Sequence, residues 1–225
     1  MLQLDFTPEA YLFDMNGTMI DDMGFHLIAW ANVLNNELHA NLTDEQVKQQ
    51  MYGKNEELLA RVFGEDHFTQ AQADAIAMDK ERAYQAAYKP HLQLISGLGP
   101  VLAEAQRKGI KMAIGTAAIP FNIDFVLDNL QLREYFPVIV SANDVKQSKP
   151  HPEVFLKCAE LLGVAPAKCI VFEDAPKGVE AALNAGMKAV AITTLHEAHE
   201  FAQYPNILAF VKDYHDPAIR ELLER

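Results

Sequence analysis

Short apolar runs alternate with helical patterns along most of this chain, and this alternation restricts the fold more than any other feature of the sequence. Strands that are joined by helices lie parallel in one sheet, with helices covering both faces. The predicted strands are residues 11–13, 112–115, 138–141, 170–172 and 189–192, and the clearest helical patterns between the later ones are residues 152–162 and 177–185. Gly109, Gly163 and Gly186 stand where helices should end. The sequence therefore predicts an α/β protein with a doubly wound parallel sheet.

One long stretch, residues 21–89, interrupts the alternation. It is polar and contains no convincing strand, and its predicted helices are residues 26–38, 43–51, 55–63 and 69–88. Thr43 stands three residues before Gln46, which is the spacing of a capping box at a helix start. We expect an inserted all-helical domain at residues 21–89, and a core domain built from residues 1–20 and 90–225.

Composition narrows the class of protein. Half of the 225 residues are hydrophobic and 22% are charged, as in ordinary globular proteins. A formal net charge of −12 argues against a broad surface for nucleic acid or anionic membranes. No run approaches the ~20 apolar residues of a membrane span. We expect a cytoplasmic monomer that binds neither nucleic acid nor membrane, with Cys158 and Cys169 as buried thiols.

Polar and charged residues follow four of the predicted strands at the point where each ends. The carboxyl ends of parallel strands meet at one edge of a sheet, where ligands bind. Carboxylates are hard oxygen ligands suited to Mg²⁺, a lysine supplies a point charge for phosphate, and a threonine supplies a hydroxyl. The residues concerned are Asp14 with Asn16, then Thr116, then Lys149, and finally Glu173 with Asp174.

These segments read FDMNGT, IGTAA, SKPHPEVF and FEDAPKGVEAA, in this order along the chain. Together they closely resemble the motifs of the haloacid dehalogenase-like superfamily, and the resemblance covers essentially the whole chain. The helical insert directly after the first motif resembles the cap of the β-phosphoglucomutase-like branch. The resemblance implies a Rossmann-like core with an inserted helical cap, and a phosphatase that acts on a small phosphorylated metabolite.

Carried over to this sequence, the resemblance implies that Asp14 attacks phosphorus and becomes an aspartyl-phosphate. Mg²⁺ would be held by Asp14, the backbone carbonyl of Asn16, and Asp174. Glu173 would support the ion directly or through water.

The same resemblance implies that Thr116 and Lys149 bind the transferring phosphoryl group, with Ala117 beside them. Lys54, in a predicted cap loop, would reach the substrate or else lie at the surface. His26 would sit at the hinge, where an imidazole could shuttle protons. The alternative for His26 is a histidine whose hydrogen bonds are already satisfied between the domains.

Asn16 occupies the position of a second aspartate that protonates the leaving group in many relatives. General acid–base catalysis of this kind contributes about 10² to 10⁴ in rate, and an amide cannot supply it. We therefore expect a phosphatase whose rate depends strongly on the leaving group, unless His26, Asp21 or Asp22 replaces the lost proton relay.

Three other functions stay open. A sugar-phosphate mutase is disfavoured because apolar residues follow Thr116 and no arginine stands near Gly53. A phosphonate hydrolase would use a cap lysine as a Schiff base, with Lys54 as the candidate. A non-catalytic phosphate-metabolite binding module would have no need of the nucleophile Asp14.

Overall fold

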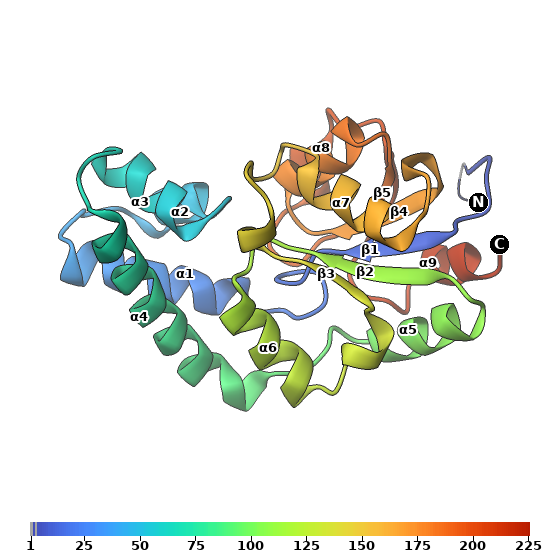
Figure 1. Cartoon of the computed structure of the whole chain (residues 1–225), viewed down its shortest axis with the longest axis horizontal. Helices are drawn as coiled ribbons and strands as arrows, with labels where there is room; N and C mark the ends of the chain where they lie inside the picture. The colour runs from blue at the N-terminus through green and yellow to red at the C-terminus, as the bar shows by residue number, and fades with distance from the viewer. Residues whose placement is uncertain (1, 3) are drawn as a thin grey trace. The chain divides into compact units, whose positions relative to one another are not determined.

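The computed structural model describes residue 2 and residues 4–225 of the chain (Figure 1). The chain separates into two compact units. The first runs up to Asp21 and resumes at Gln93, and the second is the continuous segment Asp22–Leu92.

The first unit is built on a six-stranded parallel sheet with the order β3-β2-β1-β4-β5-β6. The predicted α/β doubly wound class is confirmed, and all five predicted strands are present. The sequence reading missed β6, an edge strand whose half-buried side chains weaken its apolar pattern. The strands are β1 (Ala10–Phe13), β2 (Lys111–Gly115), β3 (Val138–Val140), β4 (Cys169–Glu173), β5 (Lys188–Ile192) and β6 (Ile207–Val211).

Successive side chains of β1 lie on opposite faces of this sheet, as they do in any β-strand. Ala10 and Leu12 pack in the cluster that includes residues of α7 (Glu153–Leu162) and α8 (Pro176–Asn184). On the other face, the Tyr11 hydroxyl donates to the Leu222 carbonyl of α9 (Pro217–Leu223), and the Phe13 ring lies 5.9 Å from that of Phe136. Figure 1 shows α7 and α8 on one face, and α9 and α5 (Leu98–Arg107) on the other.

The helices of this unit are α5 (Leu98–Arg107), α6 (Pro120–Asn129), α7 (Glu153–Leu162), α8 (Pro176–Asn184) and α9 (Pro217–Leu223). Short 3₁₀ turns lie at Arg133–Tyr135, Ala142–Asp144, Pro166–Lys168 and Ala198–Phe201. Cys158 and Cys169 are buried free thiols, as predicted.

The second unit contains no strand among its residues, which the structure describes in full. Its first helix is α1 (Met23–Ala31), which continues as a π-helical turn η1 (Asn32–Glu37). The others are α2 (Asp44–Gln50), α3 (Asn55–Phe63) and α4 (Gln70–Tyr88), followed by a 3₁₀ turn, η2 (Lys89–His91). The predicted capping box at Thr43 is present, and Thr69 makes a second one at the start of α4.

The helical unit has an apolar core of its own. Trp30 and Leu34 from its first helices pack with Val47, Leu58 and Leu59, and all five are buried. Within the described residues, no helix has both the length and the apolar character that a membrane crossing requires.

Two glycines with left-handed backbone provide a matched test of packing in the first unit. Gly163 (φ +65°) ends α7 and has open space where a Cβ would be, whereas a Cβ on Gly97 (φ +85°) would lie 2.8 Å from the Tyr214 carbonyl carbon. We expect Gly163→Ala to lower the free energy of unfolding by about 1 kcal/mol through backbone conformation alone. Gly97→Ala should lower it by a further roughly 1–3 kcal/mol, because the added methyl overpacks against backbone. Urea denaturation measures both, and equal losses would contradict this account.

Candidate active site

The register of the sheet brings Asp14 level with the acidic end of β4. Phe13, the last residue of β1, pairs with Ile114 on one side and Phe172 on the other. The Asp14 amide then donates to the Phe172 carbonyl at 3.0 Å, which continues the ladder by one residue. Asp14 therefore stands beside the point where Glu173 ends β4.

Three carboxylates meet at this edge: Asp14, Glu173 and Asp174 each place an oxygen within 4.8 Å of the others. All three are buried, with exposed fractions of 7%, 2% and 3%. The Lys149 ammonium lies 2.7 Å from Asp14 Oδ1 and 2.8 Å from Glu173 Oε1. One lysine cannot balance three carboxylates, so an excess of two negative charges remains when all are ionised.

This crowding shifts the ionisation of the groups. Burial raises the pKa of Asp14 from 3.8 to about 6, and Glu173 adds to the shift, whereas Lys149 opposes it. Burial by itself would lower the pKa of Lys149, but Asp14 and Glu173 outweigh it and raise that pKa. The lysine therefore stays charged at neutral pH, and Asp14 is the carboxylate that ionises less readily.

The donor set fits a divalent cation. Carboxylate oxygens in a site with two excess negative charges are what Mg²⁺ prefers. Glu173 uses Oε1 for Lys149, and its Oε2 accepts a hydrogen bond from the Ala175 amide at 2.7 Å. Asp14 and Asp174 would therefore be the better placed ligands for such a cation, with Glu173 in support. Asn16 is half-buried in the turn after β1 and forms an isolated bridge with Ile20.

Two glycines allow the carboxylates to approach the backbone. A Cβ on Gly178 would lie 1.7 Å from Glu173 Oε1, and one on Gly17 would lie 2.1 Å from Asp174 Oδ2. Gly17 also has a φ of +73°, which favours glycine. The sequence reading assigned no role to either glycine, although both lie inside the motifs FDMNGT and FEDAPKGVEAA.

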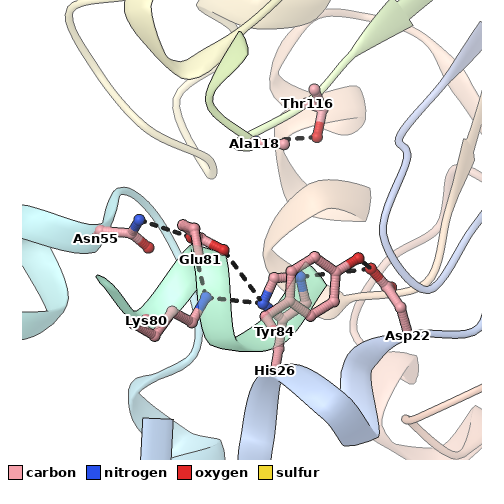
Figure 2. Close-up of polar contacts among 8 residues, drawn as sticks. All are labelled: Asp22, His26, Asn55, Lys80, Glu81, Tyr84, Thr116 and Ala118. Carbon is pink, nitrogen blue, oxygen red and sulfur yellow. Dashed lines mark hydrogen bonds and ion pairs between the residues drawn. The ribbon is translucent and has the colours of Figure 1, made fainter. Parts of the chain in front are cut away.

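Thr116 follows β2 and continues its pairing, because its amide donates to the Val140 carbonyl at 3.0 Å. Its side chain is buried, and Oγ1 accepts a hydrogen bond from the Ala118 amide at 3.1 Å (Figure 2). That bond does not use the hydroxyl hydrogen, which stays available for a further acceptor. Ala117, next to it, is half-buried.

His26 belongs to α1 in the helical unit, where both of its ring nitrogens have partners (Figure 2). Nδ1 lies 2.8 Å from Lys80 Nζ, and Nε2 lies 3.4 Å from Asp22 Oδ2. The ring stacks on Tyr84 at 3.8 Å, and the Tyr84 hydroxyl donates to Asp22. Both ring nitrogens thus find their partners inside the helical unit, whereas the alternative considered from the sequence was a histidine satisfied between the domains. A role for His26 as the replacement acid stays a prediction, which these contacts do not favour.

The sequence did not identify Lys80 in α4 as a site residue, because a lysine in a polar helical stretch is ordinarily exposed. Its side chain is nevertheless buried, with Nζ 3.0 Å from Glu81 Oε1 and 4.9 Å from the centre of the Trp30 ring. Burial lowers the pKa of Lys80, and Glu81 opposes that shift. Asn55 completes the network by donating to Glu81 Oε1 at 2.8 Å (Figure 2).

The other predicted residues of the helical unit are less buried or already paired. Lys54 is half-buried at the start of α3, where its amide donates to Glu57 Oε2 at 2.9 Å. Asp22 is buried against Tyr84. Asp21, the last residue before the helical unit, is exposed.

The buried network predicts a large stability cost for removing its cation. Lys80→Met leaves Glu81 buried without its counter-ion, and we expect the free energy of unfolding to fall by about 3–5 kcal/mol. Lys89→Met, at an exposed position, is the matched control and should change it by less than about 0.5 kcal/mol. The double variant Lys80→Met/Glu81→Gln should recover part of the loss, because no unpaired charge remains. Equal unfolding curves for the two single variants would refute the network.

Comparison with known proteins agrees with the geometry. A family model described as haloacid dehalogenase-like hydrolase matches residues 11–192. Fructose-1-phosphate phosphatase YqaB of Escherichia coli (strain K12) is 34% identical over 185 residues, covering 82% of this chain and 96% of the relative. Beta-phosphoglucomutase of Bacillus subtilis (strain 168) is 31% identical over 192 residues, covering 82% and 83%.

Among solved structures, a family IA, variant 3 HAD hydrolase from Entamoeba histolytica HM-1:IMSS superposes with a TM-score of 0.83 at 25% identity. The match covers 96% of this chain and 100% of that one. The family model spans the sheet from β1 to β5, with every acidic residue of the cluster inside it. The chain therefore belongs to the haloacid dehalogenase-like hydrolase family and to its β-phosphoglucomutase-like branch.

Proposed function

We propose that this protein is a Mg²⁺-dependent phosphatase that hydrolyses phosphoric monoesters or anhydrides of a small phosphorylated metabolite through an aspartyl-phosphate on Asp14. The observation that carries the proposal is the position of the Lys149 ammonium, 2.7 Å from Asp14 Oδ1 and 2.8 Å from Glu173 Oε1 in a buried acidic cluster. A carboxylate that only capped a turn would not need a buried cation held by two acids.

The chemistry assigned to these side chains has two steps. An ionised oxygen of Asp14 attacks phosphorus, so that an O–P bond forms and the bond to the leaving oxygen breaks with its electron pair on that oxygen. Water then attacks the same phosphorus, and the bond to Asp14 breaks to release inorganic phosphate. Lys149 and the Thr116 hydroxyl bind the phosphoryl oxygens and offset their charge in both steps.

Asp14, Asp174 and the backbone carbonyl of Asn16 would hold Mg²⁺, with Glu173 in support. When bound, the ion supplies positive charge to the phosphoryl oxygens. It would also match the two excess negative charges of the cluster, which Lys149 alone leaves unbalanced.

The names of the relatives support a substrate class. YqaB is named for fructose 1-phosphate, and Escherichia coli hexitol phosphatase A is 31% identical over 189 residues. We infer a small phosphorylated carbohydrate or a metabolite of similar size. The helical unit Asp22–Leu92 would act as the cap that selects it, with Lys54 as a candidate contact. The monomeric state and the cytoplasmic location stay predictions.

The alternative functions find less support. A mutase needs polar groups for a second phosphate, and half-buried Ala117 and Ala118 supply only backbone. A phosphonate hydrolase needs an accessible amine, and its candidate stays the half-buried Lys54, because the Lys80 amine is buried and paired with Glu81. A pure binding module would not require Lys149 to offset charge on Asp14.

The main test compares leaving groups in the Asn16→Asp variant. A carboxylic acid at position 16 restores a proton donor, so hydrolysis of an alkyl phosphate such as a hexose phosphate should rise by about 10² to 10⁴. Hydrolysis of acetyl phosphate or p-nitrophenyl phosphate should change far less, because these groups leave without a proton. Steady-state kcat with each substrate measures the contrast.

Asp14→Asn in the same assays is the control, and it should abolish turnover of every substrate along with any acid-stable trace of phosphoenzyme. An unchanged rate on the alkyl phosphate in Asn16→Asp would show that Asn16 does not limit the enzyme. A wild-type protein that neither turns over any phosphate ester nor forms a phosphoenzyme would refute the phosphatase proposal itself.

Metal binding should depend on pH because Asp14 must be ionised to bind the ion. The pKa of Asp14 rises from 3.8 to about 6 in the folded protein. The metal-free protein therefore holds an extra proton over this range, and loses stability as the pH rises through it. We expect Mg²⁺ to bind about tenfold more weakly at pH 5 than at pH 7, since it must then displace that proton.

Titration calorimetry on the metal-free protein measures this difference, and thermal unfolding with and without Mg²⁺ provides an independent reading. Asp174→Asn is the control, because it removes a ligand and should weaken binding at both pH values. Equal affinities at pH 5 and pH 7 in the wild type would exclude Asp14 as a ligand.

A further inference from the structure

Two backbone carbonyls in the turn after Asp14 are held by side chains from the far end of the chain. The Gly17 carbonyl accepts a hydrogen bond from Thr194 Oγ1 at 2.7 Å. The next carbonyl, that of Thr18, accepts one from the Tyr214 hydroxyl at 2.9 Å. Two successive peptide groups of this turn are thereby fixed in orientation, and Thr18 and Tyr214 are both buried.

The fixed turn is the part of the backbone that contacts Asp174. The Thr18 hydroxyl donates to Asp174 Oδ1 at 3.3 Å. The other carboxylate oxygen, Oδ2, lies against Gly17, where a Cβ would be only 2.1 Å away. Any rotation of these peptide groups would therefore move the groups that orient the Asp174 carboxylate.

Tyr214 is itself firmly placed. Its amide donates to the Ser96 carbonyl at 2.9 Å, and its ring centre lies 5.9 Å from that of Phe172, the residue before Glu173. The next residue, His215, places Nε2 3.1 Å from Ser96 Oγ. The Gly97 backbone packs closely against this segment, since a Cβ on Gly97 would lie only 2.8 Å from the Tyr214 carbonyl carbon. These contacts hold the Tyr214 side chain in the position from which its hydroxyl donates to the Thr18 carbonyl.

We propose that Tyr214 is a positioning residue for the acidic cluster. Tyr214 acts through Thr18 to orient Asp174, and it thereby sets the affinity of the cluster for Mg²⁺. This inference deepens the proposed function and rests on it for the identity of the ion. Tyr214 lies after β6, outside the four motifs and outside the region that the family model matches.

Tyr11 provides a matched control within the same unit. It is also buried, and its hydroxyl also donates to a backbone carbonyl, that of Leu222 at 3.2 Å. That carbonyl belongs to the end of α9 and has no part in the turn after Asp14. Tyr11→Phe and Tyr214→Phe therefore remove the same chemical group and leave an equivalent carbonyl without its donor.

The experiment measures the Mg²⁺ dissociation constant of the metal-free protein by titration calorimetry, together with urea unfolding of each variant. Losing one hydrogen bond in the chain of contacts to Asp174 should raise the dissociation constant of Tyr214→Phe about three- to tenfold. Tyr11→Phe should lower stability to a similar extent and leave the dissociation constant within about twofold of wild type. Thr18→Val should reproduce the Tyr214→Phe effect, and Thr18→Ser, which keeps the hydroxyl, should not.

The inference is overturned if Tyr214→Phe binds Mg²⁺ as the wild type does, if Tyr11→Phe weakens binding equally, or if the wild type does not bind Mg²⁺. Phosphatase assays on the same samples keep the two proposals apart. A wild type that binds Mg²⁺ with the expected dependence on Tyr214 but hydrolyses no phosphate ester would refute the proposed function alone.

Discussion

The Lys149 ammonium, shared by Asp14 and Glu173, is the interaction on which the arrangement of this site depends. Burying an ionised carboxylate without a partner costs several kcal/mol, and three of them are buried here within a few ångströms. One cation offsets only part of that cost. Local hydrogen bonds offset a further part of it, and each of these bonds requires the neighbouring backbone to lie close to a carboxylate.

Those requirements account for residues that carry no reactive group. Glu173 accepts the Ala175 amide and occupies the space that a side chain at position 178 would fill. Asp174 accepts the Thr18 hydroxyl and lies against Gly17. The two glycines are thus required by carboxylate positions and not by turn geometry alone. The motif residues around the acids are best understood as the means of keeping the charged cluster in place.

The helical unit also buries charged side chains, and it compensates their charge in a different way. Lys80 pairs with Glu81 and lies over the Trp30 ring, and His26 is held between Lys80 and Asp22. Here one cation, Lys80, faces two buried carboxylates, Glu81 and Asp22, and Asp22 also accepts the Tyr84 hydroxyl. The excess of negative charge is smaller than beside Lys149, where one cation faces three carboxylates. This difference separates the two groups of buried ionisable residues by chemistry.

Much of the fold was predictable because its signals are local. Apolar runs located five strands, and Thr43 with Gln46 located a helix start, since both depend on residues a few positions apart. The acids Asp14, Glu173 and Asp174 were predictable as a group because parallel strands end at one edge. β6 escaped notice because an edge strand is half exposed and its pattern is correspondingly weak. Lys80 escaped because burial of a lysine depends on what surrounds it.

By itself, the sequence determined the α/β class, the helical insertion and the identity of the residues at the strand ends. Periodicity and short motifs are enough for that, because they record which side chains must face a core or a turn. Only the tertiary structure decided that Glu173 has both oxygens engaged, that His26 is paired on both ring nitrogens, and that Tyr214 reaches the turn after Asp14. These are contacts between segments far apart in the chain, and their geometry exists only when the sheet and helices have packed.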